Sequence, residues 1–326
     1  MPEPDSRRSV WRGIRRRWRP LLAYTVMAGI VGLVLLNLFL DLLVSRYERN
    51  APRDPGTPYL KGMAPRELGP PDATLAVLFV HGFIGAQSNF NDLPDRVAES
   101  GYFVRTMRLP GHGTSPRDFE RTSAHDLQAG VLAEVRALKG RFPKVVVVGH
   151  SLGGALATLA VAEEPVDGLV LCAPFFDLTW NRILGVPTGR IAQSLAPVVR
   201  WLPGRPGGGP VNLKANRKRI DFYHWIPMQG VLTALEIARQ ARSTEVCGAI
   251  AAPMFVLHSK IDTVTSQAAT EQMLPAFGSA SKQVLWLETS DHVVFWDYEE
   301  ELVAERVLAF IEELESHDVN QPGFRE

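Results

Sequence analysis

The segment Gly149-His150-Ser151-Leu152-Gly153-Gly154 carries the clearest chemical signal in this chain of 326 residues. It follows the apolar run Lys144–Val148 and opens the helix-period segment Leu152–Glu164, so a strand, a sharp turn and a helix are predicted in succession. In that setting a G-x-S-x-G pattern raises the serine above the sheet edge, and the helix N-terminus favours developing negative charge. Ser151 is therefore the candidate nucleophile, and the competing interpretation is a helix N-cap.

A serine hydroxyl becomes a useful nucleophile only when a base within hydrogen-bond reach takes its proton. Asp262 follows the predicted strand Pro253–Leu257, and His292 follows the predicted strand Gln283–Leu287. The carboxyl ends of parallel strands meet at one sheet edge, so both side chains are expected near Ser151. We expect His292 to act as general base and then general acid, with Asp262 fixing its tautomer.

Other polar residues near these strand ends offer alternatives. Asp177 follows the preceding strand and remains a second candidate for the acid. Asp291 is adjacent to His292, so its side chain is expected to point elsewhere. His150 is interpreted as structural, and His258 as closing its strand through a local hydrogen bond.

An oxyanion in a tetrahedral intermediate requires preorganised donors, usually backbone N–H groups. The Leu152 N–H, directly after the nucleophile, is one candidate. The second is the Phe83 N–H, because His81-Gly82-Phe83 follows the predicted strand Leu75–Val80 and Gly82 permits a close approach. The alternative for this segment is a simple turn.

The elements that would position these residues alternate along the chain. Six short apolar runs predict strands, and five helix-period segments lie among them, which indicates an α/β fold with a mostly parallel sheet and helices on both faces. The core is expected at 74–174 and 253–315, followed by a tail at 316–326. The connection at 175–252 is too long for one crossover helix, so an inserted helical subdomain is expected there, with a mobile loop at Pro203–Pro210.

The insert is rich in aromatic and aliphatic residues, and two interpretations stay open. These side chains either roof a pocket for an acyl chain or form a small core of the insert itself. The residues in question are Phe175, Phe176, Trp180, Ile183, Leu184, Trp201, Phe222, Tyr223, Trp225 and Ile226.

The N-terminal region predicts a membrane anchor. Residues 1–20 are basic, and residues 21–44 are almost wholly apolar, interrupted by Asn37 and Asp41, with a length sufficient to cross a bilayer. The arginine excess before this segment places the N-terminus in the cytoplasm and the catalytic domain outside it. A cleaved signal and a buried core helix are the alternatives, and residues 45–73 are expected to form a linker.

Composition narrows the range of partners. The chain has 35 basic and 35 acidic residues, so no overall field favours nucleic acid. Two cysteines do not suggest a disulfide framework.

Taken together, the motifs resemble those of a known group. His81-Gly82-Phe83, Leu109-Pro110-Gly111-His112-Gly113, Gly149–Gly154, Asp262 and His292 are similar to α/β-hydrolases of the monoacylglycerol lipase, carboxylesterase and serine aminopeptidase group, over about Thr74–Leu314. The resemblance implies a lid between strands 6 and 7 of that fold, an acyl-binding pocket beneath it, and no metal or organic cofactor. His112 would be structural.

The chain departs from this group at two places. Ser259 stands where related proteins often have glycine, and the usual early antiparallel strands are not evident before Leu75.

These observations favour a membrane-anchored serine hydrolase that cleaves a carboxylic ester with a medium or long acyl chain, such as a monoacylglycerol or lysophospholipid. A serine aminopeptidase-like activity is the alternative, and it would need a carboxylate in the insert, such as Glu236 or Glu245, to hold the substrate ammonium. A non-catalytic binding protein is the third possibility, although all three triad positions are filled. The oligomeric state stays open.

Overall fold

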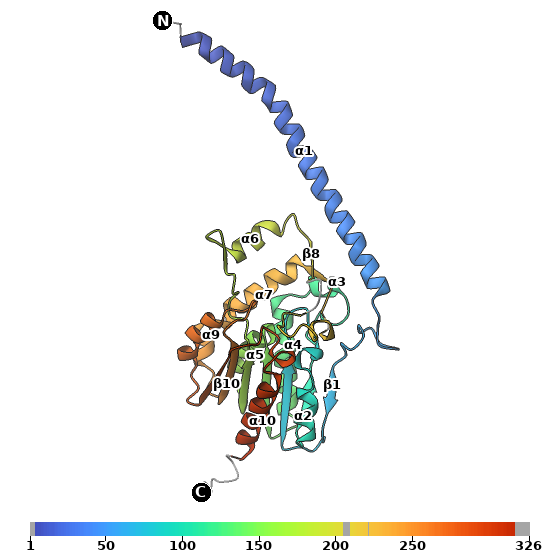
Figure 1. Cartoon of the computed structure of the whole chain (residues 1–326), viewed down its shortest axis with the longest axis vertical. Helices are drawn as coiled ribbons and strands as arrows, with labels where there is room; N and C mark the ends of the chain where they lie inside the picture. The colour runs from blue at the N-terminus through green and yellow to red at the C-terminus, as the bar shows by residue number, and fades with distance from the viewer. Residues whose placement is uncertain (1–3, 205–208, 221, 317–326) are drawn as a thin grey trace.

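A computed structural model of the chain describes residues 4–204, 209–220 and 222–316, with the backbone alone for residues 4–21. A long N-terminal helix extends away from an α/β domain (Figure 1). The centre of the Pro203–Pro210 loop and the tail from residue 317 lie outside the described residues.

The domain is built on a seven-stranded sheet in the order β1-β3-β2-β4-β5-β10-β11. Only β1 runs antiparallel to its neighbour, and the other strands pair in parallel. The strands are β1 (Arg66–Leu68), β2 (Leu75–Val80), β3 (Phe103–Thr106), β4 (Lys144–His150), β5 (Gly168–Cys172), β10 (Met254–Ser259) and β11 (Lys282–Leu287). The six predicted strands are all present, and the predicted fold class is confirmed.

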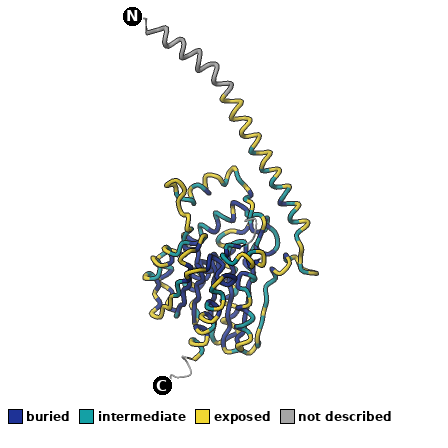
Figure 2. The backbone as a smooth tube through the Cα atoms, viewed as in Figure 1, coloured by how far each residue is buried: buried dark blue, intermediate teal, exposed yellow. Residues whose placement is uncertain are grey.

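Helices cover both faces of this sheet, which explains why β2 and β5 are buried along their whole length. One face packs against α4 (Ala124–Lys139) and α5 (Leu152–Glu163). The other face packs against α2 (Leu93–Glu99) and α10 (Glu300–Ser316). Alternate residues of β4 divide between the two cores. Figure 2 shows the resulting buried centre.

The remaining short elements connect these layers. They are α3 (Pro116–Glu120), α9 (Gln267–Met273) and the 3₁₀ helices η1 (Gln87–Phe90), η2 (Arg217–Arg219), η3 (Leu274–Ala276) and η4 (Val294–Trp296).

The segment expected to be a linker, residues 45–73, is partly built into the domain, which corrects the expectation. Strand β1 pairs with β3, and the side chains of Leu60 and Met63 are buried. A three-residue strand is too short to show an alternating pattern, and its register depends on a partner nearly forty residues later. The folded domain therefore begins before Thr74.

The insert between β5 and β10 is mixed rather than purely helical. Its helices are α6 (Thr188–Leu195), α7 (Met228–Ala241) and α8 (Thr244–Gly248). Its two small antiparallel sheets are β6 (Arg182–Ile183) with β7 (Val186–Pro187) and β8 (Trp201–Pro203) with β9 (Trp225–Pro227). In Figure 1, α6 and α7 lie above the sheet, on the side toward which the N-terminal helix extends.

The apolar side chains of the insert do not act as one group. Phe175 and Phe176 belong to the main core, and Trp201 is buried as well. Trp180 and Leu184 are exposed. These side chains therefore form neither one roof over an acyl pocket nor one small core of the insert.

The N-terminal helix α1 runs from Pro4 to Asn50. In the described part of the chain, it is the one helix long and apolar enough to cross a membrane, and the apolar side chains between Leu22 and Leu42 are mostly exposed.

Candidate active site

Ser151 occupies a strained turn between β4 and α5. Its backbone has φ 55° and ψ −120°, a conformation that non-glycine residues rarely adopt. A Cβ added to Gly149 would lie 2.6 Å from the Gly153 carbonyl oxygen, and one added to Gly153 would collide with the Val80 carbonyl. The glycines therefore allow the turn. The Ser151 side chain makes no capping hydrogen bond to α5, so the N-cap interpretation fails.

Three side chains from separate loops form a continuous hydrogen-bonded chain. His292 Nε2 lies 2.9 Å from Ser151 Oγ, and His292 Nδ1 lies 2.7 Å from Asp262 Oδ2. Because the Asp262 carboxylate accepts from Nδ1–H, Nε2 is left to accept the serine proton. Each of the three residues is only 5% exposed, which excludes bulk water from these bonds.

The loop after β10 holds the Asp262 carboxylate firmly. Oδ1 accepts the N–H groups of Val264 and Thr265, each at 2.7 Å, and Oδ2 accepts the Thr265 hydroxyl at 2.8 Å. Burial alone would raise the pKa of this carboxyl, but charge on His292 and hydrogen bonds from His258 and His292 hold the pKa well below its usual range. Asp262 is therefore ionised at any ordinary pH.

His258 is a member of this network that the sequence interpretation missed. Its Nε2 lies 3.2 Å from Asp262 Oδ2 and 3.2 Å from the Thr265 carbonyl oxygen, while its Nδ1 lies 2.9 Å from the Thr270 hydroxyl. Since both partners of Nε2 are acceptors, Nε2 carries the proton. The sequence signal for this contact was the position of His258. It lies near the end of β10, four residues before Asp262 in the loop that follows this strand.

Ser259 ties two loops of the site together. Its hydroxyl donates to the Ser290 carbonyl and accepts the Ile261 N–H at 3.1 Å. The loops carrying Asp262 and His292 are therefore joined by a direct bond.

The other acidic candidates have different partners. Asp177 forms an ion pair with Arg242 at 2.9 Å and accepts the Leu178 N–H. Asp291 accepts the Thr263 N–H at 2.8 Å and points away from the imidazole of its neighbour His292. The carboxylate that contacts this imidazole is that of Asp262.

The geometry around Gly82 orients the proposed oxyanion donor. The Gly82 carbonyl accepts from His81 Nδ1 at 2.9 Å and from the Gly85 N–H at 3.2 Å. In a trans peptide the Phe83 N–H points the opposite way. A Cβ added to Gly82 would lie 3.1 Å from Ser151 Cβ, so this loop borders the nucleophile.

Both N–H groups expected in the oxyanion hole are available for a ligand. Across residues 4–204, 209–220 and 222–316, neither the Phe83 N–H nor the Leu152 N–H donates a hydrogen bond to a protein acceptor.

Buried neutral histidines surround the site. His81 Nε2 accepts the Leu109 N–H at 3.1 Å, which places the proton on Nδ1, and burial lowers its pKa to about 4. His150 Nε2 lies 3.1 Å from the His292 carbonyl oxygen, and burial lowers its pKa to about 3. Burial also lowers the pKa of His112 to about 3. His112 Nδ1 lies 3.1 Å from the Pro110 carbonyl oxygen, and the structural roles expected of His150 and His112 stay predictions.

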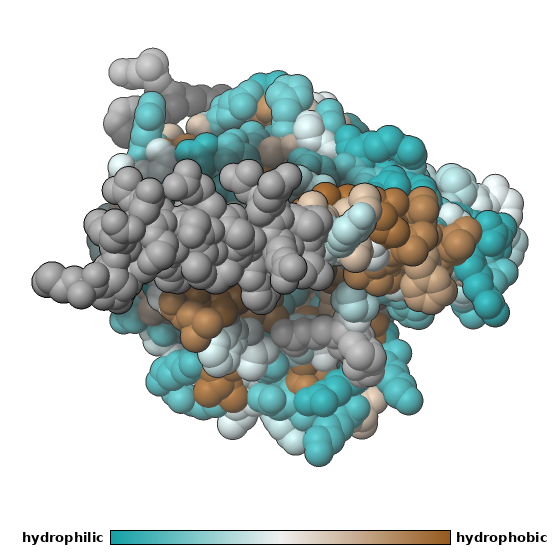
Figure 3. All heavy atoms as spheres, turned by 90° about the horizontal axis from the view of Figure 1, so that it is seen from above, coloured by the Kyte–Doolittle hydropathy of each residue, from teal (hydrophilic) through white to brown (hydrophobic). Residues whose placement is uncertain are grey.

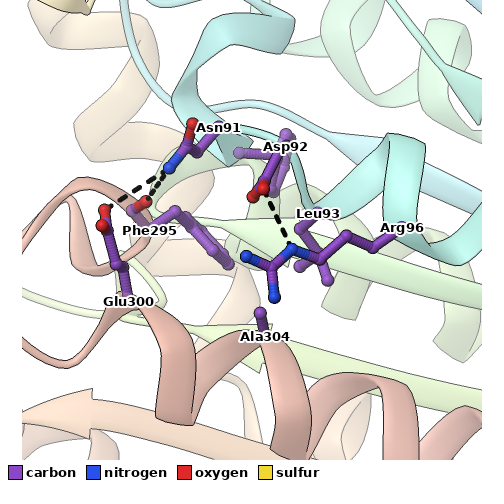
Figure 4. A pocket seen from close by; sticks show the side chains of 8 residues that line it. Asn91, Asp92, Leu93, Arg96, Phe295, Glu300 and Ala304 are labelled. Carbon is purple, nitrogen blue, oxygen red and sulfur yellow. Dashed lines mark hydrogen bonds and ion pairs between the residues drawn. The ribbon is translucent and has the colours of Figure 1, made fainter.

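Two cavities in the described domain lie away from these residues. One, of about 70 Å³, lies between α2 and α10, where the Asn91 amide contacts the Phe295 carbonyl and Glu300 (Figure 4). The other, of about 400 Å³, borders the Asp177–Arg242 pair. Ser151 lines neither cavity.

Comparisons with known proteins agree with this architecture. Residues 71–299 match the family described as "Serine aminopeptidase, S33". The thermostable monoacylglycerol lipase of Bacillus sp. (strain H-257) is 29% identical over 264 residues, which cover 78% of this chain and 96% of the relative. The carboxylesterase of Bacillus subtilis is 24% identical, covering 74% and 93%.

A solved structure from work on the metagenome-derived lipolytic enzymes LipS and LipT superposes with a TM-score of 0.70 at 28% identity, covering 78% of this chain and 99% of that one. The chain belongs to the serine aminopeptidase, S33, family, and it is an α/β-hydrolase of the esterase and lipase group.

Proposed function

We propose that Ser151, His292 and Asp262 form a catalytic triad that hydrolyses a carboxylic ester through an acyl-enzyme. The observation that carries this proposal is the unbroken chain of bonds from Ser151 Oγ through the His292 ring to the Asp262 carboxylate.

The chemistry follows from this geometry. His292 Nε2 takes the Ser151 proton as Oγ attacks the ester carbonyl, and the N–H groups of Phe83 and Leu152 stabilise the resulting oxyanion. Collapse of this intermediate releases the alcohol, which receives the proton from His292. Water then attacks the acyl-enzyme, with His292 again acting as base, and releases the carboxylic acid.

The substrate we propose is an ester with a medium or long acyl chain, such as a monoacylglycerol or lysophospholipid. The relative from Bacillus sp. is named a monoacylglycerol lipase. We further propose that the insert, residues 175–252, acts as a lid. Ser151 is 5% exposed, and the insert follows β5, the strand beside the one that leads to Ser151.

We also propose that α1 anchors the enzyme in a membrane. Its exposed apolar side chains require a nonpolar surrounding, and the arginines before residue 20 favour a cytoplasmic N-terminus with the catalytic domain on the other side. Protease protection of this domain in intact cells tests the topology.

The peptidase alternative receives no support from the insert carboxylates. Glu236 is engaged by Arg239 and Gln240, and Glu245 is exposed to solvent. Neither is reserved for a substrate ammonium group.

Turnover by the full-length protein tests the proposal. Nitrophenyl esters of two to twelve carbons and a monoacylglycerol are compared with an aminoacyl nitroanilide, using Ser151→Ala as control. Ser151-dependent hydrolysis of esters with eight or more carbons is expected. Cleavage of the nitroanilide alone would contradict the ester assignment.

A further inference from the structure

Polar residues of α1 line up on one side of an otherwise apolar helix. Asn37, Asp41, Ser45 and Glu48 are spaced by four, four and three residues, which places them along a single face. We call these four residues the polar stripe. An unpaired carboxylate within a membrane-spanning segment is costly, so the partners of Asp41 decide how this helix is placed.

The upper end of the polar stripe contacts the insert. Asn37 Nδ2 donates to the Val198 carbonyl at 2.8 Å, and Asn37 Oδ1 accepts the Arg200 N–H at 3.1 Å. The backbone that follows α6 is therefore held against α1 by both ends of one amide.

Asp41 is the centre of the contact. Its Oδ1 lies 2.9 Å from the Arg200 guanidinium, 3.1 Å from the Arg117 guanidinium and 3.2 Å from Trp201 Nε1. Trp201 is buried, with 1% of its surface exposed. Two guanidinium groups and an indole N–H therefore bind the Asp41 carboxylate.

The lower end of the polar stripe is docked as well. Arg117 bonds Glu48 at 3.0 Å and the Ser45 hydroxyl at 2.8 Å, and Val44 beside them is fully buried. From Asn37 onward, α1 is part of the folded domain rather than a free tether, so the direction of the helix sets the orientation of the domain.

An exposed apolar surface lies close to this contact. We call it the apolar tip, and it consists of Trp180, Ile183, Leu184, Val186, Leu195 and Val198, on the β6–β7 hairpin, on α6 and just after α6. Among the described residues outside α1, these are six of the nine exposed large apolar side chains, and Leu184 is 99% exposed.

The chain segment that carries the apolar tip has charges of one sign. Residues 178–220 contain no aspartate or glutamate but eight lysines and arginines. Exposed apolar side chains combined with only basic charge are typical of segments that lie in the interface of a bilayer with anionic lipids.

We propose that the apolar tip is a second contact with the bilayer that α1 spans, and that docking through Asp41 holds it there. In Figure 1, α6 lies on the side of the domain toward which α1 extends, and Figure 3, which looks onto that face, shows hydrophobic patches among hydrophilic surface. This inference rests on the proposed anchoring by α1, and it commits to an anionic lipid surface as the partner.

Lipid-quenching of site-specific fluorophores tests the contact. The full-length protein is reconstituted into vesicles containing phosphatidylglycerol and lipids with brominated acyl chains, with an environment-sensitive dye at Leu184→Cys. Cys172 and Cys247 are buried, which favours labelling at the introduced cysteine. Ile30→Cys on α1 reports the anchor, and the exposed Tyr298→Cys is the control.

The proposal predicts at least twofold quenching at Leu184 and at Ile30, with no quenching at Tyr298. Absence of quenching at Leu184 overturns the second contact, and a dye response that depends on protein concentration instead would assign the surface to a second copy. Quenching at Ile30 is an independent readout, so failure of the anchor and failure of the apolar tip are distinguished.

A second variant tests the docking. Asp41→Ala is expected to reduce quenching at Leu184 by at least half while quenching at Ile30 is retained, and the exposed Asp72→Ala is the matched control. Unchanged quenching at Leu184 in Asp41→Ala would overturn the role of Asp41.

Discussion

His258 Nε2 lies 3.2 Å from Asp262 Oδ2, the same oxygen that meets His292 Nδ1 at 2.7 Å. Two imidazoles therefore share one buried carboxylate oxygen. His292 continues to Ser151, whereas His258 continues to Thr270, so His258 fixes the carboxylate from the side away from the nucleophile.

Replacing His258 by leucine is expected to lower kcat about 10- to 100-fold, because a hydrogen bond to a charged group is worth about 1.5–3 kcal/mol. KM should change little, since His258 is a positioning residue that lies behind Asp262. Steady-state kinetics on a soluble nitrophenyl ester measures both constants, with the exposed His125→Ala as control. A large increase in KM with unchanged kcat would contradict this role.

The two candidate acids can be separated by one pair of variants. Asp262→Asn is expected to reduce kcat about 10⁴-fold, because the imidazole loses the partner that sets its tautomer. Asp177→Asn should stay within threefold of the parent, since its carboxylate pairs with Arg242. Comparable losses in the two variants would show that the acid has been assigned wrongly.

The Phe83 N–H is expected to contribute to catalysis through the backbone alone. Phe83→Pro removes this donor and should lower kcat about 10²–10³-fold, as the loss of one oxyanion donor does. Phe83→Leu keeps the N–H, so it should retain most of the activity. Thermal unfolding of both variants checks that the fold is intact, and equal kcat values in the two folded variants would argue against this donor.

Stability should fall as the pH drops below 6.5. The folded-state pKa values of His81, His112 and His150 lie at about 4, 3 and 3, so the unfolded chain binds protons at these sites first. Each site then destabilises the fold by up to about 1.4 kcal/mol per pH unit between pH 6.5 and its folded pKa.

Denaturant unfolding of the full-length protein between pH 7.5 and 4.5 measures this slope. Asp262 and Glu299, whose pKa values are depressed, act in a lower window. Their contribution is lost as the pH falls from the ordinary carboxyl range toward the folded-state pKa values, because the unfolded chain takes up these protons first. His112→Gln should give a shallower slope than the parent protein. A stability that is constant from pH 6.5 to 4.5 would contradict the burial of neutral imidazoles.

The sheet and the surroundings of Ser151 could be predicted from sequence because their signals are local. The glycines at 149 and 153 are required by one turn, and parallel strands bring the loops of Asp262 and His292 to the same edge. To place each of these residues, it was enough to recognise a strand, the residue where it ends and the polar residue that follows.

The features that the sequence did not reveal depend on distant partners. Strand β1 has three residues, and β3 determines its pairing. Asp41 was visible only as an interruption of an apolar segment, because Arg200 and Trp201, about 160 residues later, give it a role. His258 lies within a run typical of a buried strand, which hides its contact with Asp262.

Covalent capture of the nucleophile tests the central claim most directly. The full-length enzyme is treated with an alkyl fluorophosphonate, digested and mapped by mass spectrometry, with Ser151→Ala and His292→Ala in parallel. We expect one adduct on Ser151, none in Ser151→Ala, and labelling slowed at least 100-fold in His292→Ala. An adduct on another serine that accounts for the loss of esterase activity would contradict the assignment of Ser151 as the nucleophile.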